Sequence, residues 1–199
     1  MPRQFNIRRS LFAAICAVAM VSGCAHLDVG PTPPPGSPTP TGTASSSPGL
    51  CNTTQEPSTT LVIAMSSSIT ATTDPPYGTI NGYTDAAGGS QTASVINAKT
   101  TDIIQFVNVD ANPIDHSAVG FPNAKSFPNV PYTFQSASQT PQGTAISTSQ
   151  SWSTGLIPSQ GGSGCYSQPF TIPSTGTYYL GDYTYYNLTN MRDVVVVTQ

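Results

Sequence analysis

Charged side chains are scarce in this chain of 199 residues, which has 6 lysines and arginines and 9 aspartates and glutamates. Three of the basic residues lie within residues 1–9, so the rest of the chain has Lys99, Lys125 and Arg192 against all the carboxylates. Because nucleic acids and anionic lipid surfaces attract proteins through positive charge, the sequence argues against both as partners. We expect no nucleic acid partner.

Residues that carry most protein chemistry are also few. The chain has 2 histidines and 4 cysteines, and no two cysteines have the CxxC spacing of a thiolate metal site. There is no serine in a nucleophile motif, no oxyanion-forming motif, and no second carboxylate at a useful spacing, so we do not expect an enzyme. No stretch has a convincing helical period, which argues against a helical protein.

The first 24 residues have the features of an export signal. Several arginines precede an uncharged apolar run at 11–21, which is too short to span a bilayer stably. This run ends in Val21-Ser22-Gly23-Cys24, which resembles a bacterial lipobox, where small residues precede a cysteine that receives lipid. The resemblance implies a signal peptide at 1–23, lipidation of Cys24, and an exported lipoprotein anchored on a membrane of the cell envelope. An uncut single-pass anchor is the alternative.

The rest of the chain divides into a tether and a domain. Residues 24–50 are rich in proline, glycine, serine and threonine, a composition that favours an extended, semi-stiff linker over a packed core. Residues 51–199 have the size of one ordinary domain. Its two cysteines, Cys51 and Cys165, would lie in an oxidising compartment, so a single disulfide between them is the simplest interpretation. A pair of metal-binding thiols is the rival interpretation.

The domain has the sequence pattern of an all-β fold. Short apolar or alternating runs, separated by glycine and proline, predict strands in six places: 60–65, 94–98, 101–108, 168–172, 177–183 and 192–198. Such a series favours an antiparallel sandwich or barrel. The segment 126–163 is rich in serine, threonine and glutamine, and its pattern predicts no structure.

Three pairs of motifs occur in a characteristic order along the domain. They are Phe106-Val107-Asn108-Val109-Asp110 before His116, Trp152-Ser153-Thr154-Gly155-Leu156 before Phe170-Thr171-Ile172, and Gly176-Thr177-Tyr178 before Asn190-Met191-Arg192. Together they resemble the cupredoxins, the plastocyanin-like copper proteins, over roughly residues 58–199. The resemblance implies a Greek-key β-sandwich.

The resemblance also implies where a metal would be held. Cupredoxins bind copper through two histidines, a cysteine and often an axial methionine. His116 matches the first histidine and Met191 the methionine, but Asp182 occupies the cysteine position and Tyr185 the second histidine position. Without a thiolate the protein should not be blue, and without a second imidazole its affinity for Cu(II) should fall. Copper at a modified site, held by His116, Asp182, Met191 and Tyr185, is one hypothesis.

Each of these residues has a simpler interpretation. His116 can be a structural histidine, Met191 can fill the core, and Asp182 can bond His116 or a loop backbone instead of a metal. The domain would then be a metal-free module that serves as a binding or structural protein of the envelope, with a protein partner there. The tyrosines near the C-terminus are explained by packing, or by a platform for carbohydrate or protein.

Overall fold

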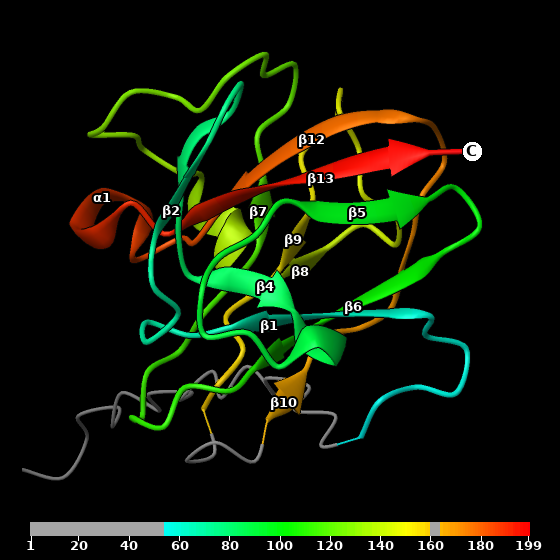
Figure 1. The fold of residues 1–199 in the computed structure, drawn as a ribbon, viewed down its shortest axis with the longest axis horizontal. Coiled ribbons are helices and arrows are strands. Elements are labelled where there is room, and N and C mark those ends of the chain that lie inside the picture. Colours follow the sequence, from blue (N-terminus) through cyan, green and yellow to red (C-terminus); the bar gives the residue numbers. More distant parts are fainter. Residues whose placement is uncertain (1–53, 160–163) are drawn as a thin grey trace, which may run out of the picture. The chain divides into compact units, whose positions relative to one another are not determined.

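The structure is a computed structural model that describes residues 54–159 and 164–199 (Figure 1). The predicted signal peptide, the lipidated Cys24, the tether and Cys51 lie outside the described residues. None of the helices in the described ranges is long and apolar enough to cross a membrane.

One sheet is built around a parallel pair of strands. Its strands are β1 (Leu61–Met65), β4 (Tyr83–Asp85), β6 (Ile103–Asn108), β10 (Cys165–Tyr166) and β11 (Phe170–Thr171). The central pair is β1 and β6, which run parallel. The strand β4 pairs antiparallel with β1, and β10 and β11 both pair antiparallel with β6.

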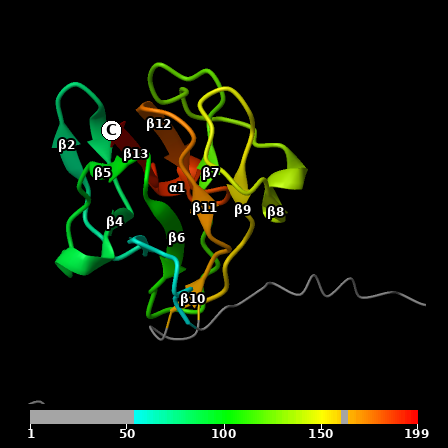
Figure 2. The ribbon, with the colours of Figure 1, turned by 90° about the vertical axis from the view of Figure 1, so that its right-hand side faces the viewer.

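The second sheet has the strand order β5-β13-β12-β7-β9-β8. Its strands are β5 (Ile96–Lys99), β7 (Val119–Gly120), β8 (Pro141–Gln142), β9 (Ser153–Thr154), β12 (Gly176–Gly181) and β13 (Arg192–Thr198). The strand β13 runs parallel to β5 and antiparallel to β12. A hairpin of β2 (Thr72–Asp74) and β3 (Gly78–Ile80) stands apart, and Figure 2 shows β2 on the opposite side of the domain from β8.

The few helical turns are short. They are η1 (Ala86–Gly88), η2 (Ser136–Gln139) and α1 (Tyr186–Thr189). The left-handed Asn190 ends α1, and its backbone N–H donates to the Tyr186 carbonyl.

The main core lies between the two sheets and follows from strand alternation. In β1, Ile63 and Met65 face this core, where they meet Phe106 of β6 and Leu180 of β12. The intervening Ala64 faces the other side and packs in a smaller apolar cluster with Ile69, Ile80, Ala93 and Val107. Two-sided burial explains why β1 reads as an almost continuous apolar run instead of a clean alternation.

The all-β sandwich predicted from the sequence is confirmed. Five of the six predicted strands agree with β1, β5, β6, β12 and β13 to within two residues at each end. The sixth, at 168–172, is reduced to the two residues of β11. The strands β2, β3, β4, β7, β8, β9 and β10 were not predicted, because two or three residues are too few to show an alternating pattern.

Gly120 provides a test of the packing between β7 and the core. A Cβ atom at Gly120 would lie 2.0 Å from Nε1 of Trp152, a side chain that is itself buried. We expect Gly120→Ala to lower the free energy of unfolding by about 1–3 kcal/mol, since the added methyl group would overlap the buried indole and force it or the backbone to shift. Urea unfolding would measure it. Gly88→Ala is the matched control, because nothing lies within 4 Å of its added Cβ, and an equal loss in both variants would contradict the prediction.

Candidate functional site

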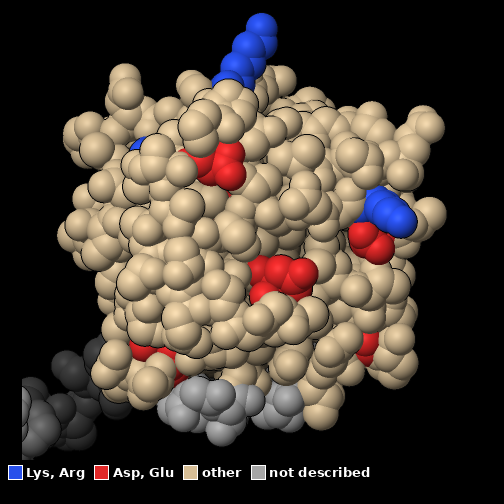
Figure 3. All heavy atoms as spheres, viewed as in Figure 1, with Lys and Arg blue, Asp and Glu red and all other residues tan. Residues whose placement is uncertain are grey.

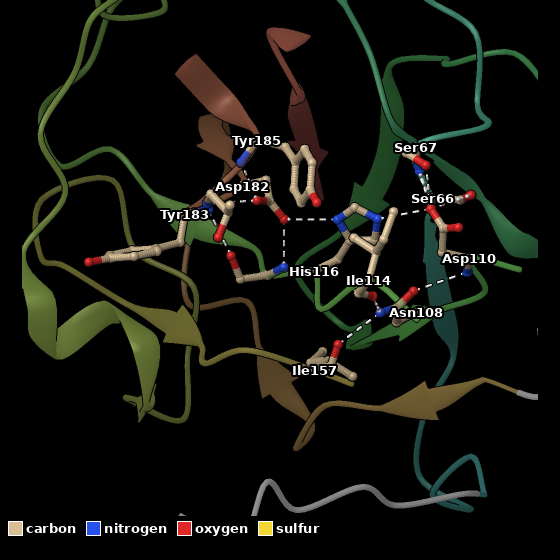
Figure 4. Close-up of polar contacts among 12 residues, drawn as sticks. Ser66, Ser67, Asn108, Asp110, Ile114, His116, Ile157, Asp182, Tyr183 and Tyr185 are labelled. Carbon is tan, nitrogen blue, oxygen red and sulfur yellow. Dashed lines mark hydrogen bonds and ion pairs between the residues drawn. The ribbon is translucent and has the colours of Figure 1, made fainter. Parts of the chain in front are cut away.

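His116 is buried at one end of the sandwich, in the segment between β6 and β7 (Figure 4). Its backbone is fixed by an isolated bridge to Ile157, in which each residue donates its N–H to the other's carbonyl, at 3.1 and 2.7 Å. The side-chain amide of Asn108, the last residue of β6, donates to the carbonyls of Ile114 and Ile157, both at 2.8 Å. These bonds hold the segment after β6 in place without regular secondary structure.

Both nitrogens of the His116 ring face a buried carboxylate. Nδ1 lies 3.2 Å from Oδ2 of Asp182, and Nε2 lies 3.1 Å from Oδ2 of Asp110. Figure 4 shows the two carboxylates on opposite sides of the ring. Asp110 and His116 lie near the two ends of the connection between β6 and β7, and Asp182 follows β12. We call them the His–Asp network.

Both carboxylate oxygens of Asp182 accept hydrogen bonds from backbone N–H groups. Oδ2 accepts the N–H of Ser117 at 2.8 Å, in addition to facing His116. Oδ1 accepts the N–H groups of Thr184 and Tyr185 at 2.8 and 2.7 Å. This pattern explains why an aspartate ends β12, since its carboxylate organises the turn that leads into α1.

Asp110 is satisfied in the same way on the other side of the ring. Its Oδ2 accepts the backbone N–H of Ser67 at 2.7 Å and the Ser67 hydroxyl at 2.6 Å, and its Oδ1 accepts the N–H of Asn112 at 2.9 Å. The Ser66 hydroxyl also donates to Oδ2, at 3.3 Å. A carboxylate that accepts this many hydrogen bonds is stable in its charged form although it is buried.

This geometry favours a charged imidazole. A neutral ring has one N–H, so one of its nitrogens would present a lone pair to a carboxylate. Burial by itself would lower the pKa of His116, but the hydrogen bonds and negative charges of Asp182, and then of Asp110, outweigh it and raise the pKa. Burial by itself would raise the pKa of Asp110, but hydrogen bonds from Ser67, Asn112 and His116 outweigh it and hold the pKa below its usual range.

Tyr185 and Met191 lie next to the network but are held by other contacts. The Tyr185 ring meets the His116 ring edge to face, with 5.2 Å between centroids. Met191 is 1 % exposed and belongs to the main core. A Cβ atom at Gly82 would lie 3.0 Å from the Met191 sulfur and nearer still to its Cγ, so the thioether packs directly on the backbone of Gly82.

The structure therefore brings together His116, Asp182 and Tyr185 of the predicted site, with Met191 in the adjoining core. Their assignment as copper ligands stays a prediction. Asp110 was quoted only as the end of the motif before His116, and its role as a partner of the imidazole was missed, because an aspartate at the end of a strand gives no sign of a tertiary partner. Cys165 is buried in β10, but its predicted partner Cys51 lies outside the described residues, so their pairing stays a prediction.

The donors present fit a copper ion poorly. Both imidazole nitrogens already face carboxylates, and each carboxylate oxygen that faces the ring also accepts backbone hydrogen bonds. Within residues 54–159 and 164–199, no three His, Cys, Asp or Glu side chains are grouped so as to hold a metal ion. Metal binding needs a deprotonated imidazole, whereas these surroundings favour the protonated one.

A further carboxylate, Asp193, is buried in β13 and was not singled out in the sequence. Its Oδ1 accepts the backbone N–H of Val194 at 2.6 Å, and its Oδ2 has no partner among the described residues. Burial raises the pKa of Asp193 well above its usual range, and the bond from Val194 offsets this only in part. Burial of Asp193 therefore favours its neutral form, in contrast to the carboxylate of Asp110.

No protein-family model and no curated protein sequence matches the chain. Several solved structures do match the chain, and these structural neighbours are cupredoxins. Rusticyanin from Thiobacillus ferrooxidans is 16% identical, with 69% of this chain and 75% of that chain covered and a TM-score of 0.37. Dithionite-reduced auracyanin from Roseiflexus castenholzii is 15% identical, with 69% and 95% covered and a TM-score of 0.38.

Auracyanin B is 14% identical, with 69% of this chain and 88% of that chain covered and a TM-score of 0.40. At identities this low the likeness concerns the fold alone. Nothing about a metal in this chain is inferred from these neighbours.

The charge of His116 predicts how stability depends on pH. A raised pKa means that the stabilisation is fully present below the ordinary value of 6.5 and is lost as the pH rises through the folded value. We expect His116→Asn to lower the free energy of unfolding by about 3 kcal/mol at pH 6, because it leaves buried carboxylates without their cation. The difference from the unmutated protein should shrink above that pH. Urea unfolding between about pH 5 and 8 would measure both, since these are the limits within which an ordinary His titrates.

Asp115→Asn is the matched control for this test, because Asp115 is the exposed neighbour of His116. Its stability should follow that of the unmutated protein at every pH. The pKa of Asp193 is also raised, so its contribution to stability likewise falls as the pH rises. The variant Asp193→Asn removes this contribution and leaves the pH dependence that comes from His116. A pH-independent difference between His116→Asn and the unmutated protein would contradict a charged imidazole.

Proposed function

We propose that this chain is a lipid-anchored protein of the bacterial cell envelope whose cupredoxin-like domain is a metal-free, non-catalytic binding module. The observation that carries the proposal is the engagement of both His116 nitrogens by buried, hydrogen-bonded carboxylates. In the resemblance to cupredoxins, His116 and Asp182 stand at two ligand positions. Here they bond each other, so the end of the sandwich that would hold a metal is closed by an ion pair.

The His–Asp network accounts for the stability that a metal would otherwise supply. It links two parts of the β6–β7 connection to each other and to the turn after β12. A bound metal stabilises a fold by joining ligands that are far apart in sequence. An imidazolium between two carboxylates joins the same segments by charge-assisted hydrogen bonds and needs no ion. Removing one member would leave an uncompensated buried charge, which typically costs about 3–5 kcal/mol.

Copper would have to overcome two free-energy costs at this site. It would displace a proton from an imidazole whose pKa is raised, and it would break a hydrogen bond to Asp182 or Asp110. It would also lack the thiolate and second imidazole that give cupredoxins their affinity. The proton therefore competes effectively with the metal near neutral pH.

The envelope location rests on the N-terminal sequence. The apolar run, the lipobox-like residues and Cys24 support export and acylation, and the tether at 24–50 would separate the domain from the membrane surface. A domain with so few catalytic groups, held outside the cytoplasm on a tether, is suited to binding a partner in the envelope.

Copper titration tests the metal-free proposal. We expect calorimetry of the full chain with Cu(II) at neutral pH to give no binding tighter than about 100 µM, because the imidazole is protonated and paired. His116→Asn and the control Asp115→Asn should behave alike. Tight one-to-one binding with a paramagnetic Cu(II) spectrum, lost in His116→Asn and kept in Asp115→Asn, would instead establish the modified copper site.

The lipid anchor is tested separately. In a bacterial host, we expect the chain to fractionate with membranes and the mature protein to begin at an acylated Cys24, as mass spectrometry would show. Cys24→Ser should abolish acylation and release the protein from the membrane fraction. Cys16→Ser is the control, because Cys16 lies in the predicted signal peptide. An unmutated protein that carries no acyl group and keeps residues 1–23 would favour the single-pass anchor.

A further inference from the structure

Five aromatic rings pack together on the outer side of the second sheet, and we call them the aromatic face: Phe121, Tyr132, Phe134, Tyr183 and Tyr186. Leu180 of β12 faces the core, so Gly181, the next residue, faces outward. A Cβ atom at Gly181 would lie 2.5 Å from the Tyr186 ring and 2.9 Å from the Phe121 ring. The absence of a side chain at Gly181 thus lets these rings lie directly on the sheet.

The rings form a continuous set. Phe121 lies 5.1 Å from Tyr132, 5.4 Å from Phe134 and 5.1 Å from Tyr186, between ring centroids. Tyr132 and Phe134 are 4.9 Å apart, and Phe134 lies 5.8 Å from Tyr183. Edge-to-face and tilted packing of this kind stabilises the cluster and fixes the orientation of each ring.

Polar bonds hold the outer rings further. The Asn187 side chain accepts the backbone N–H of Tyr132 at 2.7 Å and donates to its carbonyl at 2.8 Å. The Tyr186 hydroxyl donates to the carbonyl of Pro128, and the Gln139 amide donates to the Tyr183 hydroxyl at 3.0 Å. Figure 4 shows the Tyr183 ring directed away from His116. A ligand that stacked on these rings would lose little entropy in ordering them.

The aromatic cluster is not completely buried, because some of its rings are partly exposed to solvent. Tyr132, Phe134 and Tyr183 are each partly exposed. A pocket of about 60 Å³ opens beside them, lined by the rings of Tyr132 and Phe134 and by the following residues: Val119, Gly120, Pro122, Gln135, Ser138 and Ser151. Such a pocket is large enough for one small polar group, and none of its lining residues is charged.

Exposed apolar residues lie near the aromatic face, and Arg192 lies beside the Tyr186 hydroxyl. Val130 and Leu188 are 46 % and 70 % exposed, and they are the large hydrophobic residues that stand most exposed in the described part of the chain. Val130 lies two residues before Tyr132, and Leu188 follows Asn187, whose side chain bonds Tyr132. Figure 3 shows, for one face of the molecule, that charged groups occur as separate spots on a mostly uncharged surface.

We propose that the aromatic face binds a neutral oligosaccharide, whose pyranose rings stack on Tyr132, Phe134 and Tyr183. Gln135, Ser138 and Ser151 line the pocket, and in this proposal their amide and hydroxyl groups bond sugar hydroxyls. Flat, partly exposed rings beside amides and hydroxyls suit a ligand with both apolar C–H faces and hydroxyl groups. An ionic ligand would find no opposite charge in the pocket. This deepens the binding role proposed above and rests on it.

The test is a titration of the full chain with three neutral probes, cellohexaose, maltohexaose and chitohexaose, followed by calorimetry and amide chemical shifts. At least one should bind with a Kd below about 5 mM, and the Kd should change less than about twofold between low and high salt, since the ligand carries no charge. Tyr183→Leu and Gln135→Ala should each weaken binding several-fold. Gln135 is exposed, so its variant carries little risk of misfolding.

Tyr166→Leu is the matched control, because Tyr166 is a partly exposed tyrosine of β10, in the other sheet. It should bind as the unmutated protein does. Absence of binding for all three probes, or binding that Tyr183→Leu and Gln135→Ala leave unchanged, would overturn the proposal. So would concentration-dependent dimerisation abolished by Leu188→Ser, since a second copy would then cover this face. Failure of the sugar proposal leaves the copper result unaffected, so the two are distinguishable.

Discussion

A histidine enclosed by two aspartates is the interaction on which one end of this β-sandwich depends. The segments that meet there are irregular, and few backbone ladders tie them to one another. Water is excluded, so the charges of His116, Asp110 and Asp182 act at short range in a medium of low dielectric. Each carboxylate is in turn satisfied by backbone N–H groups, so the network fixes main chain as well as side chains.

The turn between β12 and α1 connects the His–Asp network to the outer surface. Asp182 accepts the N–H groups that shape the turn into α1, and the Ser117 hydroxyl accepts the N–H of Tyr183. The Tyr183 ring then joins the aromatic face, as does that of Tyr186. A charged centre that is too buried to meet a ligand can thus position residues that are able to meet one. In this arrangement the His–Asp network stabilises the domain, and the separate aromatic face is presented to a partner.

The prediction from sequence succeeded where a local pattern was long enough. The strand β13 is seven residues with four successive valines, and β6 has six residues that begin with two isoleucines; both were located within two residues. The strands β7 and β9 have two residues each, and their pairing depends on neighbours distant in the chain. For the site, the resemblance to cupredoxins identified His116 and Asp182, and their hydrogen bond was weighed as an alternative to metal binding. The second carboxylate, Asp110, was not found.

The sequence by itself determined the all-β class, the main strands and the departures from a blue-copper ligand set, because these depend on residue type and on spacing along the chain. Only the tertiary structure decided that Asp110 and Asp182 meet opposite nitrogens of one imidazole, since this depends on how the β6–β7 connection folds and on its meeting the turn after β12. It also decided that rings from the loop after β7 and from α1 form one surface. Charge pairing and ring packing are set by distances in space, and a linear sequence does not contain those distances.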